Sequence, residues 1–222
     1  MRTDDLIAQL AAAGARPPLP SPAKTITYWV GGLGLYFLVL IFWHGARPDL
    51  AEKLQQTLFW GELTIMLAIT TSALWVAGWL ALPDGVDSRW KRLLPLLPLI
   101  LLAGTLLYAT TAPDALSLSE CLRNHHFDCL ARVLLYAILP ALWMTVAIRR
   151  GAPTKPRWAG AMIGLAATSG GYILLRITEA SDDPTQLIVW HFFPVILLTL
   201  LGGAFGRSLF AAVWKKKNHK IP

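Results

Sequence analysis

Six long apolar segments constrain what this 222-residue chain can fold into more than any other feature of its sequence. A helix that crosses a lipid bilayer needs about 20 predominantly apolar residues. The six segments are residues 26–43, 63–82, 93–112, 129–148, 158–175 and 187–206. Five of them contain no Asp, Glu, Lys or Arg, and the fourth contains only Arg132, close to its start. We predict that all six are membrane-spanning helices.

The composition excludes several other classes of protein. Charged residues make up 15% of the chain, whereas a soluble domain carries about 25%. The apolar runs are continuous and do not alternate, which argues against the strands of a membrane barrel. The formal net charge of +7 does not indicate a nucleic-acid-binding domain, because 55% of the residues are hydrophobic. The predicted fold class is all-α, a polytopic membrane helical bundle with six transmembrane helices.

Lysine and arginine are distributed unevenly among the connecting segments. If the N-terminus is cytoplasmic, fifteen of the twenty basic residues lie on the cytoplasmic side and five lie outside. The positive-inside rule then predicts that both termini are cytoplasmic. Asp4 and Asp5 and the lack of a cleavage motif also indicate that the N-terminus is not a signal peptide. The predicted domains are a cytoplasmic tail (1–25), the six-helix transmembrane domain (26–214) and a basic cytoplasmic tail (215–222).

The N-terminal tail contains a short amphipathic helix. Thr3 is a suitable N-cap, Asp4 and Asp5 fall in the first turn, and Gly14 follows the helix. One apolar stripe is formed by Leu6, Ile7 and Leu10. A helix this short is marginal unless it covers a surface. It either folds back on the helical bundle or docks on a partner protein, and the following RPPLPSP is a stiff spacer.

The outer segment SECLRNHHFDC, between the third and fourth spans, has the richest chemistry. It contains Cys121, His125, His126 and Cys129, whose thiols and imidazoles suit zinc or copper. On one continuous helix the two cysteines would lie about 12 Å apart, too far for a disulfide. As a loop, the segment could close a disulfide or enclose a metal ion. Three readings stay open: a disulfide, a metal or redox sensor, and unpaired structural thiols.

Small residues recur at four-residue spacing in the fifth and sixth spans. Gly160 and Gly164 form one GxxxG pair, and Gly202 and Gly206 form another. Such pairs let helix backbones approach closely within a membrane. We expect them to pack helices within one chain, with homodimerisation as the alternative.

Ionisable groups are nearly absent from the predicted spans. Glu62 lies at the outer edge of the second span and His191 about one turn into the sixth, and we interpret both as interfacial polar groups. A small metal or solute permease is a rival function, but it would need polar groups converging at midspan. A thiol oxidoreductase is a third, but the chain has no C-x-x-C pair. We expect no catalytic site and no enzyme activity.

Three stretches carry a resemblance to a known family. They are MRTDDLIAQLA at the start, residues 129–167 with CL, LP, RRGAP and AGAMIGLAA, and the end with VW at 189–190 and LLGGAFGR at 200–207. In their order, spacing and six-span layout they make the chain resemble the NrsF-like family of bacterial inner-membrane anti-sigma factors, the negative regulators of sigma F.

The resemblance implies a partner, a location and a role. The partner would be an extracytoplasmic-function sigma factor, held silent at the bacterial inner membrane until a stress such as metal or oxidants releases it. The docking segment would comprise Thr3, Asp4, Asp5, Leu6 and Ile7, extended along the apolar stripe to Leu10. The sensor cysteine would be Cys129. No direct nucleic-acid contact is expected.

The chain departs from the family pattern at the outer segments. Family members typically carry a second cysteine after the fifth span, whereas RITEASDDP (176–184) contains none. His191 also stands where the resemblance leads us to expect a tyrosine. A cysteine pair bridging two outer loops is therefore not available, and Cys121, assisted by His125 and His126, is the predicted substitute.

Overall fold

The computed structural model describes residues 3–12, 21–82, 89–123, 127–151 and 153–218, and these residues form helices and connecting turns without any strand. The helices are α1 (Thr3–Ala12), α2 (Pro22–His44), α3 (Leu50–Lys53), α4 (Thr57–Leu80), α5 (Arg89–Leu93), α6 (Leu96–Ala109), α7 (Leu118–Arg123), α8 (Phe127–Arg149), α9 (Pro156–Thr178), α10 (Pro184–Gln186), the π-helix η1 (Leu187–Phe192) and α11 (Phe193–Asn218). The predicted all-α class is confirmed.

Six helical stretches are long and apolar enough to cross a membrane, and each overlaps one of the six predicted segments. They are Pro22–His44, Thr57–Leu80, Trp90–Ala109, Asp128–Arg149, Pro156–Thr178 and Pro184–Ala211. The third stretch is interrupted between α5 and α6, just where Pro95 stands. Proline cannot donate a backbone hydrogen bond and its ring collides with the preceding turn, so the helix restarts there.

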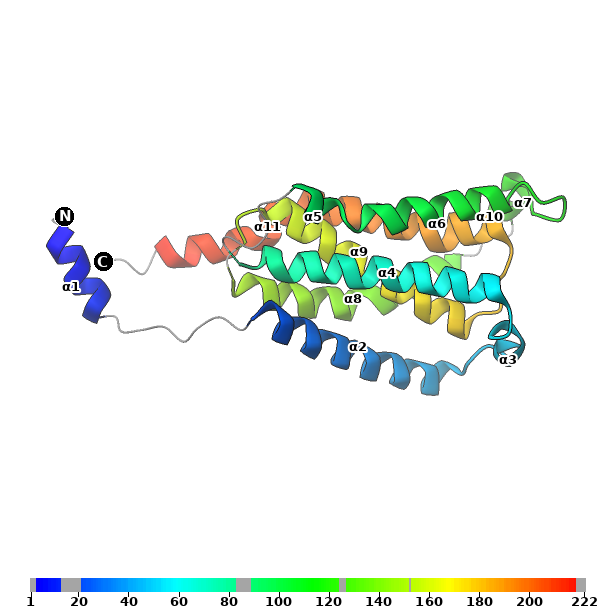
Figure 1. Cartoon of the computed structure of the whole chain (residues 1–222), viewed down its shortest axis with the longest axis horizontal. Coiled ribbons are helices and arrows are strands. Elements are labelled where there is room, and N and C mark those ends of the chain that lie inside the picture. Colours follow the sequence, from blue (N-terminus) through cyan, green and yellow to red (C-terminus); the bar gives the residue numbers. More distant parts are fainter. Residues whose placement is uncertain (1–2, 13–20, 83–88, 124–126, 152, 219–222) are drawn as a thin grey trace.

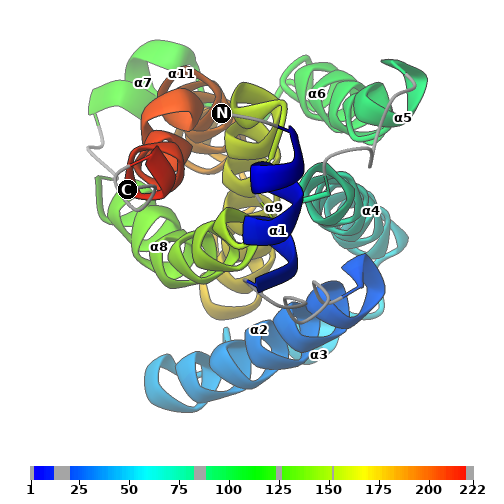
Figure 2. The same cartoon turned by 90° about the vertical axis from the view of Figure 1, so that its left-hand side faces the viewer.

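The six stretches lie side by side, with α9 in the middle of the bundle (Figures 1 and 2). Most of the apolar window of α9, 78%, is buried, against 6% for α2 at the edge. Large apolar side chains point outward instead, among them Leu35 and Phe42 on α2. A belt of exposed apolar side chains around a packed centre is typical of a bundle surrounded by lipid.

Glycines allow the backbones of α9 and α11 to approach closely. A Cβ atom added to Gly160 would lie 2.1 Å from the carbonyl oxygen of Gly202, and one added to Gly206 would lie 2.3 Å from that of Pro156. No side chain fits at these positions without moving the backbones apart. Both GxxxG pairs therefore pack helices within the chain, as predicted.

The bundle has two chemically different ends. The helix α1 and the C-terminal part of α11 lie at one end, and α3 and α7 lie at the other (Figure 1). We call these the α1 end and the α7 end. Nine acidic residues of the described parts fall at the α7 end: Asp49, Glu52, Glu62, Asp114, Glu120, Asp128, Glu179, Asp182 and Asp183. Basic residues dominate the α1 end: Lys24, Lys91, Arg92, Arg149, Arg150, Lys155, Arg157 and Arg207.

A π-helical turn opens the sixth span. The backbone N–H of Phe193 donates to the carbonyl of Ile188, five residues earlier, as a π-helix requires. The wide turn stands directly before Pro194, which has no N–H to continue the regular ladder. Turns of this kind are frequent at functional sites, and this one contains His191.

Candidate functional site

The predicted docking segment forms the helix α1. Thr3 begins the helix, Asp4 and Asp5 lie in its first turn, and these side chains are exposed. Ile7 is 58% exposed. Leu6 and Leu10 lie on the same helix, but their side chains are outside the described residues, as is Gly14.

The helix α1 lies beyond the α1 end of the bundle (Figures 1 and 2). It makes no extensive contact with any other helix in the described parts of the chain. The two predicted alternatives, a helix folded back on the bundle and a helix docked on a partner protein, both stay predictions. An exposed apolar residue on such a helix is available to a partner.

The two cysteines lie at the α7 end, Cys121 on α7 and Cys129 in the first turn of α8. Both are buried free thiols within one apolar cluster, beside Tyr136 and Trp190. Burial raises the pKa of Cys121, and a hydrogen bond with Trp190 opposes this only in part. Cys121 is therefore held as an unreactive thiol. His125 and His126, the predicted assistants, lie outside the described residues.

Among the described residues, the structure brings two others to Cys129. The Cys129 thiol donates a hydrogen bond to Glu179 Oε1, at 2.8 Å. The imidazole of His191 completes a group whose potential ligand atoms all lie within 4.8 Å of one another. Neither Glu179 nor His191 was predicted to join a site with Cys129. They stand 50 and 62 positions further along the chain, and only the packing of α8, α9 and η1 unites them.

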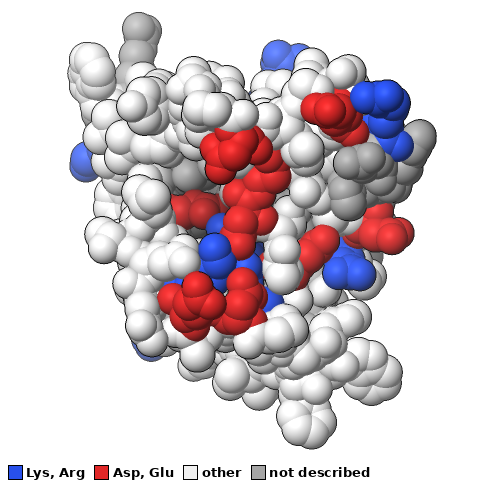
Figure 3. Space-filling model, turned by 90° about the vertical axis from the view of Figure 1, so that its right-hand side faces the viewer, with Lys and Arg blue, Asp and Glu red and all other residues white. Residues whose placement is uncertain are grey.

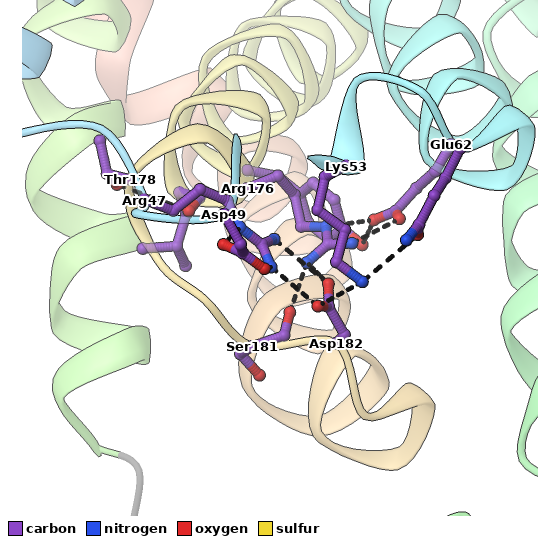
Figure 4. Close-up of polar contacts among 11 residues, drawn as sticks. Arg47, Asp49, Lys53, Glu62, Arg176, Thr178, Ser181 and Asp182 are labelled. Atoms are coloured by element: carbon purple, nitrogen blue, oxygen red, sulfur yellow. Dashed lines mark hydrogen bonds and ion pairs between the residues drawn. The ribbon is translucent and has the colours of Figure 1, made fainter. Parts of the chain in front are cut away.

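An ion network around two buried arginines, Arg47 and Arg176, occupies the same end of the bundle (Figure 4). Arg176, near the end of α9, pairs with Glu62 of α4 at 2.9 Å and with Asp182 at 3.0 Å. Arg47, from the turn between α2 and α3, binds Asp49 through two hydrogen bonds of 2.7 and 2.8 Å. These side chains come from segments that are far apart in the sequence, so the network fastens the turns of the α7 end together.

Asp182 lies at the centre of this ion network. It accepts from Arg47 at 2.7 Å, pairs with Lys53 at 2.9 Å and contacts Arg176. Burial raises the pKa of Asp182, but the hydrogen bonds from Arg47 and Lys53 outweigh it and hold the pKa well below its usual range. The carboxylate therefore stays ionised at neutral pH.

The ion network contains equal numbers of positive and negative side chains, and an aromatic ring packs against its two arginines. The three cations Arg47, Lys53 and Arg176 face the three carboxylates of Asp49, Glu62 and Asp182. The ring of Phe59 lies beneath both guanidinium groups, 5.8 Å from that of Arg47 and 5.2 Å from that of Arg176. In Figure 3 acidic side chains gather around a few basic ones on this face. The balance explains how so many charges are tolerated beside apolar helices.

Comparison with known proteins gives the family. The pattern of the family described as "Negative regulator of sigma F" matches residues 10–211. The chain is 34% identical over 220 residues to the anti-sigma-F factor NrsF of Caulobacter vibrioides (strain NA1000 / CB15N), covering 94% of this chain and 99% of that protein. The chain belongs to the family of negative regulators of sigma F.

A second relative in the NrsF family is more distant. The probable anti-sigma-F factor NrsF of Azospira oryzae (strain ATCC BAA-33 / DSM 13638 / PS) is 21% identical over 214 residues, again covering 94% of this chain and 99% of the relative. No solved structure matches this chain. The NrsF family pattern begins at residue 10, so most of the predicted docking segment precedes it.

Proposed function

We propose that the chain is a membrane-bound anti-sigma factor of the bacterial inner membrane. It sequesters an extracytoplasmic-function sigma factor at the cytoplasmic surface and releases it on a metal or redox signal from the other side. The chain is a regulator and carries out no catalysis. The predicted division into a docking tail, a six-helix membrane domain and a basic C-terminal tail fits this role.

The observation that carries the proposal is the separation of two functional elements by the length of the bundle. The exposed docking helix α1 lies at the basic end, and the buried thiols lie at the acidic end. Basic residues favour the cytoplasmic side of a membrane. A sigma factor works in the cytoplasm, so this orientation places α1 within its reach and Cys129 towards the outside.

The helices α8, α9 and α11 run between the two ends of the bundle and could transmit a change at the thiols to the α1 end. Cys129 lies in the first turn of α8 and Arg149 ends this helix, where the Arg149 Nε–H donates to the carbonyl of Leu209 on α11 at 2.7 Å. The tight glycine contacts join α11 to α9. The glycine contacts couple a shift of α11 to α9, and the hydrogen bond of Arg149 couples α8 to α11, which gives a change at the thiols a path to the α1 end.

The energetic requirement for release is modest. Moving a sigma factor from almost fully bound to almost fully free takes a difference in binding free energy of about 5.5 kcal/mol. A metal ion bound through a thiolate provides on the order of 10 kcal/mol, and a disulfide about 2–4 kcal/mol. A metal ion therefore reaches the required scale, whereas a disulfide alone supplies only part of it.

Labelling with a membrane-impermeant maleimide tests the orientation. In a chain carrying Cys121→Ser and Cys129→Ser, one new cysteine is introduced at an exposed position, either Ser119→Cys on α7 or Ala11→Cys on α1. In intact spheroplasts we expect the reagent to label position 119 and not position 11. Both should be labelled after permeabilisation, which is the control. Labelling of position 11 alone in intact spheroplasts would overturn the orientation.

A further inference from the structure

We infer that Cys129, Glu179 and His191 form a zinc-type metal site. This site would receive the metal signal named above, and its regulatory role rests on the proposed function. The binding of the metal itself is independent of any sigma factor. The site differs from the predicted set of Cys121, His125, His126 and Cys129, with which it shares one residue.

The geometry fits a tetrahedral ion. Zinc binds sulfur at about 2.3 Å and nitrogen or oxygen at about 2.0–2.2 Å, so that ligand atoms in a tetrahedral site lie about 3.3–3.8 Å apart. The three ligand atoms here already lie within 4.8 Å of one another. To reach this geometry the widest pair would contract by about 1 Å. Cys129 Sγ and Glu179 Oε1, which lie 2.8 Å apart while the thiol proton is between them, would separate by at least about 0.5 Å once that proton leaves. The three donors leave a fourth position for water or another ligand.

The charges also favour a divalent ion. Cys129 and His191 are buried and Glu179 is partly buried, a setting in which an uncompensated charge is costly. A divalent cation with a thiolate, a carboxylate and a neutral imidazole makes a neutral unit. Binding removes the thiol proton, which now lies in the hydrogen bond to Glu179 Oε1, and releases it to solvent.

The second oxygen of Glu179 adds independent support. Glu179 Oε2 is buried and accepts no hydrogen bond from any described residue. The guanidinium of the half-exposed Arg132 lies 3.6 Å from this oxygen through Nη1, too far for a hydrogen bond. Buried carboxylate oxygens are normally satisfied by hydrogen bonds or by a cation. A metal ion in this group would supply the missing partner.

The donor set selects the class of metal. A thiolate with an imidazole suits zinc and other borderline or soft ions, whereas magnesium and calcium take oxygen ligands alone. The ligands come from α8, from the end of α9 and from the π-helical turn η1. An ion bound there would draw together the start of α8, the end of α9 and the turn that leads into α11, and these three helices run to the α1 end.

X-ray absorption spectroscopy on the purified full-length wild-type chain, loaded with Zn²⁺, tests the ligand set without any mutation. We expect one sulfur neighbour, with nitrogen and oxygen filling the remaining positions and an imidazole among them. Two sulfur neighbours would assign the ion to the Cys121–Cys129 segment and overturn the site. No bound zinc after dialysis would overturn it as well.

Matched variants test the individual ligands. Cys129→Ser, Glu179→Gln and His191→Phe should each raise the dissociation constant for Zn²⁺ by at least about tenfold. Cys121→Ser and His44→Phe, which change the same residue types at the same end of the bundle, should leave it unchanged. Equal loss in both sets would contradict the site. All these measurements omit the sigma factor, so their failure is distinct from a failure of sequestration.

Discussion

Ile7→Asp is expected to free the sigma factor and raise transcription from its promoters almost to the level seen without the chain. Ile7 is an exposed apolar residue on α1, at the middle of the stripe that Leu6 and Leu10 continue in the sequence. A carboxylate placed in the apolar centre of an interface would be desolvated without a partner. Loss of such a central contact costs about 2 kcal/mol or more, which is a fall in affinity of about thirtyfold.

The control for this experiment lies one position further along. Ala8 is also exposed on α1, but it follows Asp4 and Asp5 around the helix on the polar face. Ala8→Asp adds the same charge and should leave transcription repressed. The readout is a promoter reporter, with the amount of membrane-bound chain measured in parallel. Equal repression by both variants, or repression that survives removal of residues 1–12, would show that α1 does not hold the sigma factor.

Arg176→Met should produce the largest loss of stability at the α7 end, about 3–5 kcal/mol. The side chain of Arg176 is 4% exposed and that of its partner Glu62 is 13% exposed. Tyr172 and Arg176 are the only described groups that hydrogen-bond to Glu62. Removing the guanidinium therefore leaves a carboxylate in apolar surroundings without a cation. The measurement is the free energy of unfolding in mixed micelles titrated with a denaturing detergent.

A surface arginine provides the comparison for Arg176. Arg132 is 45% exposed and lies 3.6 Å from Glu179, so Arg132→Met should cost less than about 1 kcal/mol. The double variant Arg176→Met with Glu62→Leu should recover much of the loss, because it removes the stranded carboxylate too. A double variant as unstable as Arg176→Met alone would contradict the explanation. In that case the cost would come from packing and not from charge.

The six long apolar helices could be predicted from the sequence because their signal is local. A run such as residues 63–82 contains all the information that a lipid-spanning helix needs, namely length and the lack of charge. The helix-packing role of the two GxxxG pairs could be predicted in the same way, since a four-residue spacing puts both glycines on one helix face. Even the interruption of the third span depends on one residue, Pro95.

The ion network and the group around Cys129 could not be predicted in this way. Arg176 and Glu62 stand 114 positions apart, and Arg47 and Asp182 stand 135 apart. From the sequence alone, each of these charged residues is indistinguishable from an ordinary loop residue, and Glu62 is interpreted as a polar group at the membrane interface. His191 is buried only because the π-helical turn and the packing of α8 and α9 enclose it. Such sites depend on tertiary packing, which leaves no local pattern.

The central claim is that this chain holds a sigma factor at the membrane. Fractionation of cells tests it most directly, with each extracytoplasmic-function sigma factor of the cell tagged in turn. The account predicts that one tagged sigma factor is found in the membrane fraction with the wild-type chain and in the soluble fraction with Ile7→Asp. If every sigma factor stays soluble beside the wild-type chain, or stays on the membrane beside Ile7→Asp, the account is contradicted.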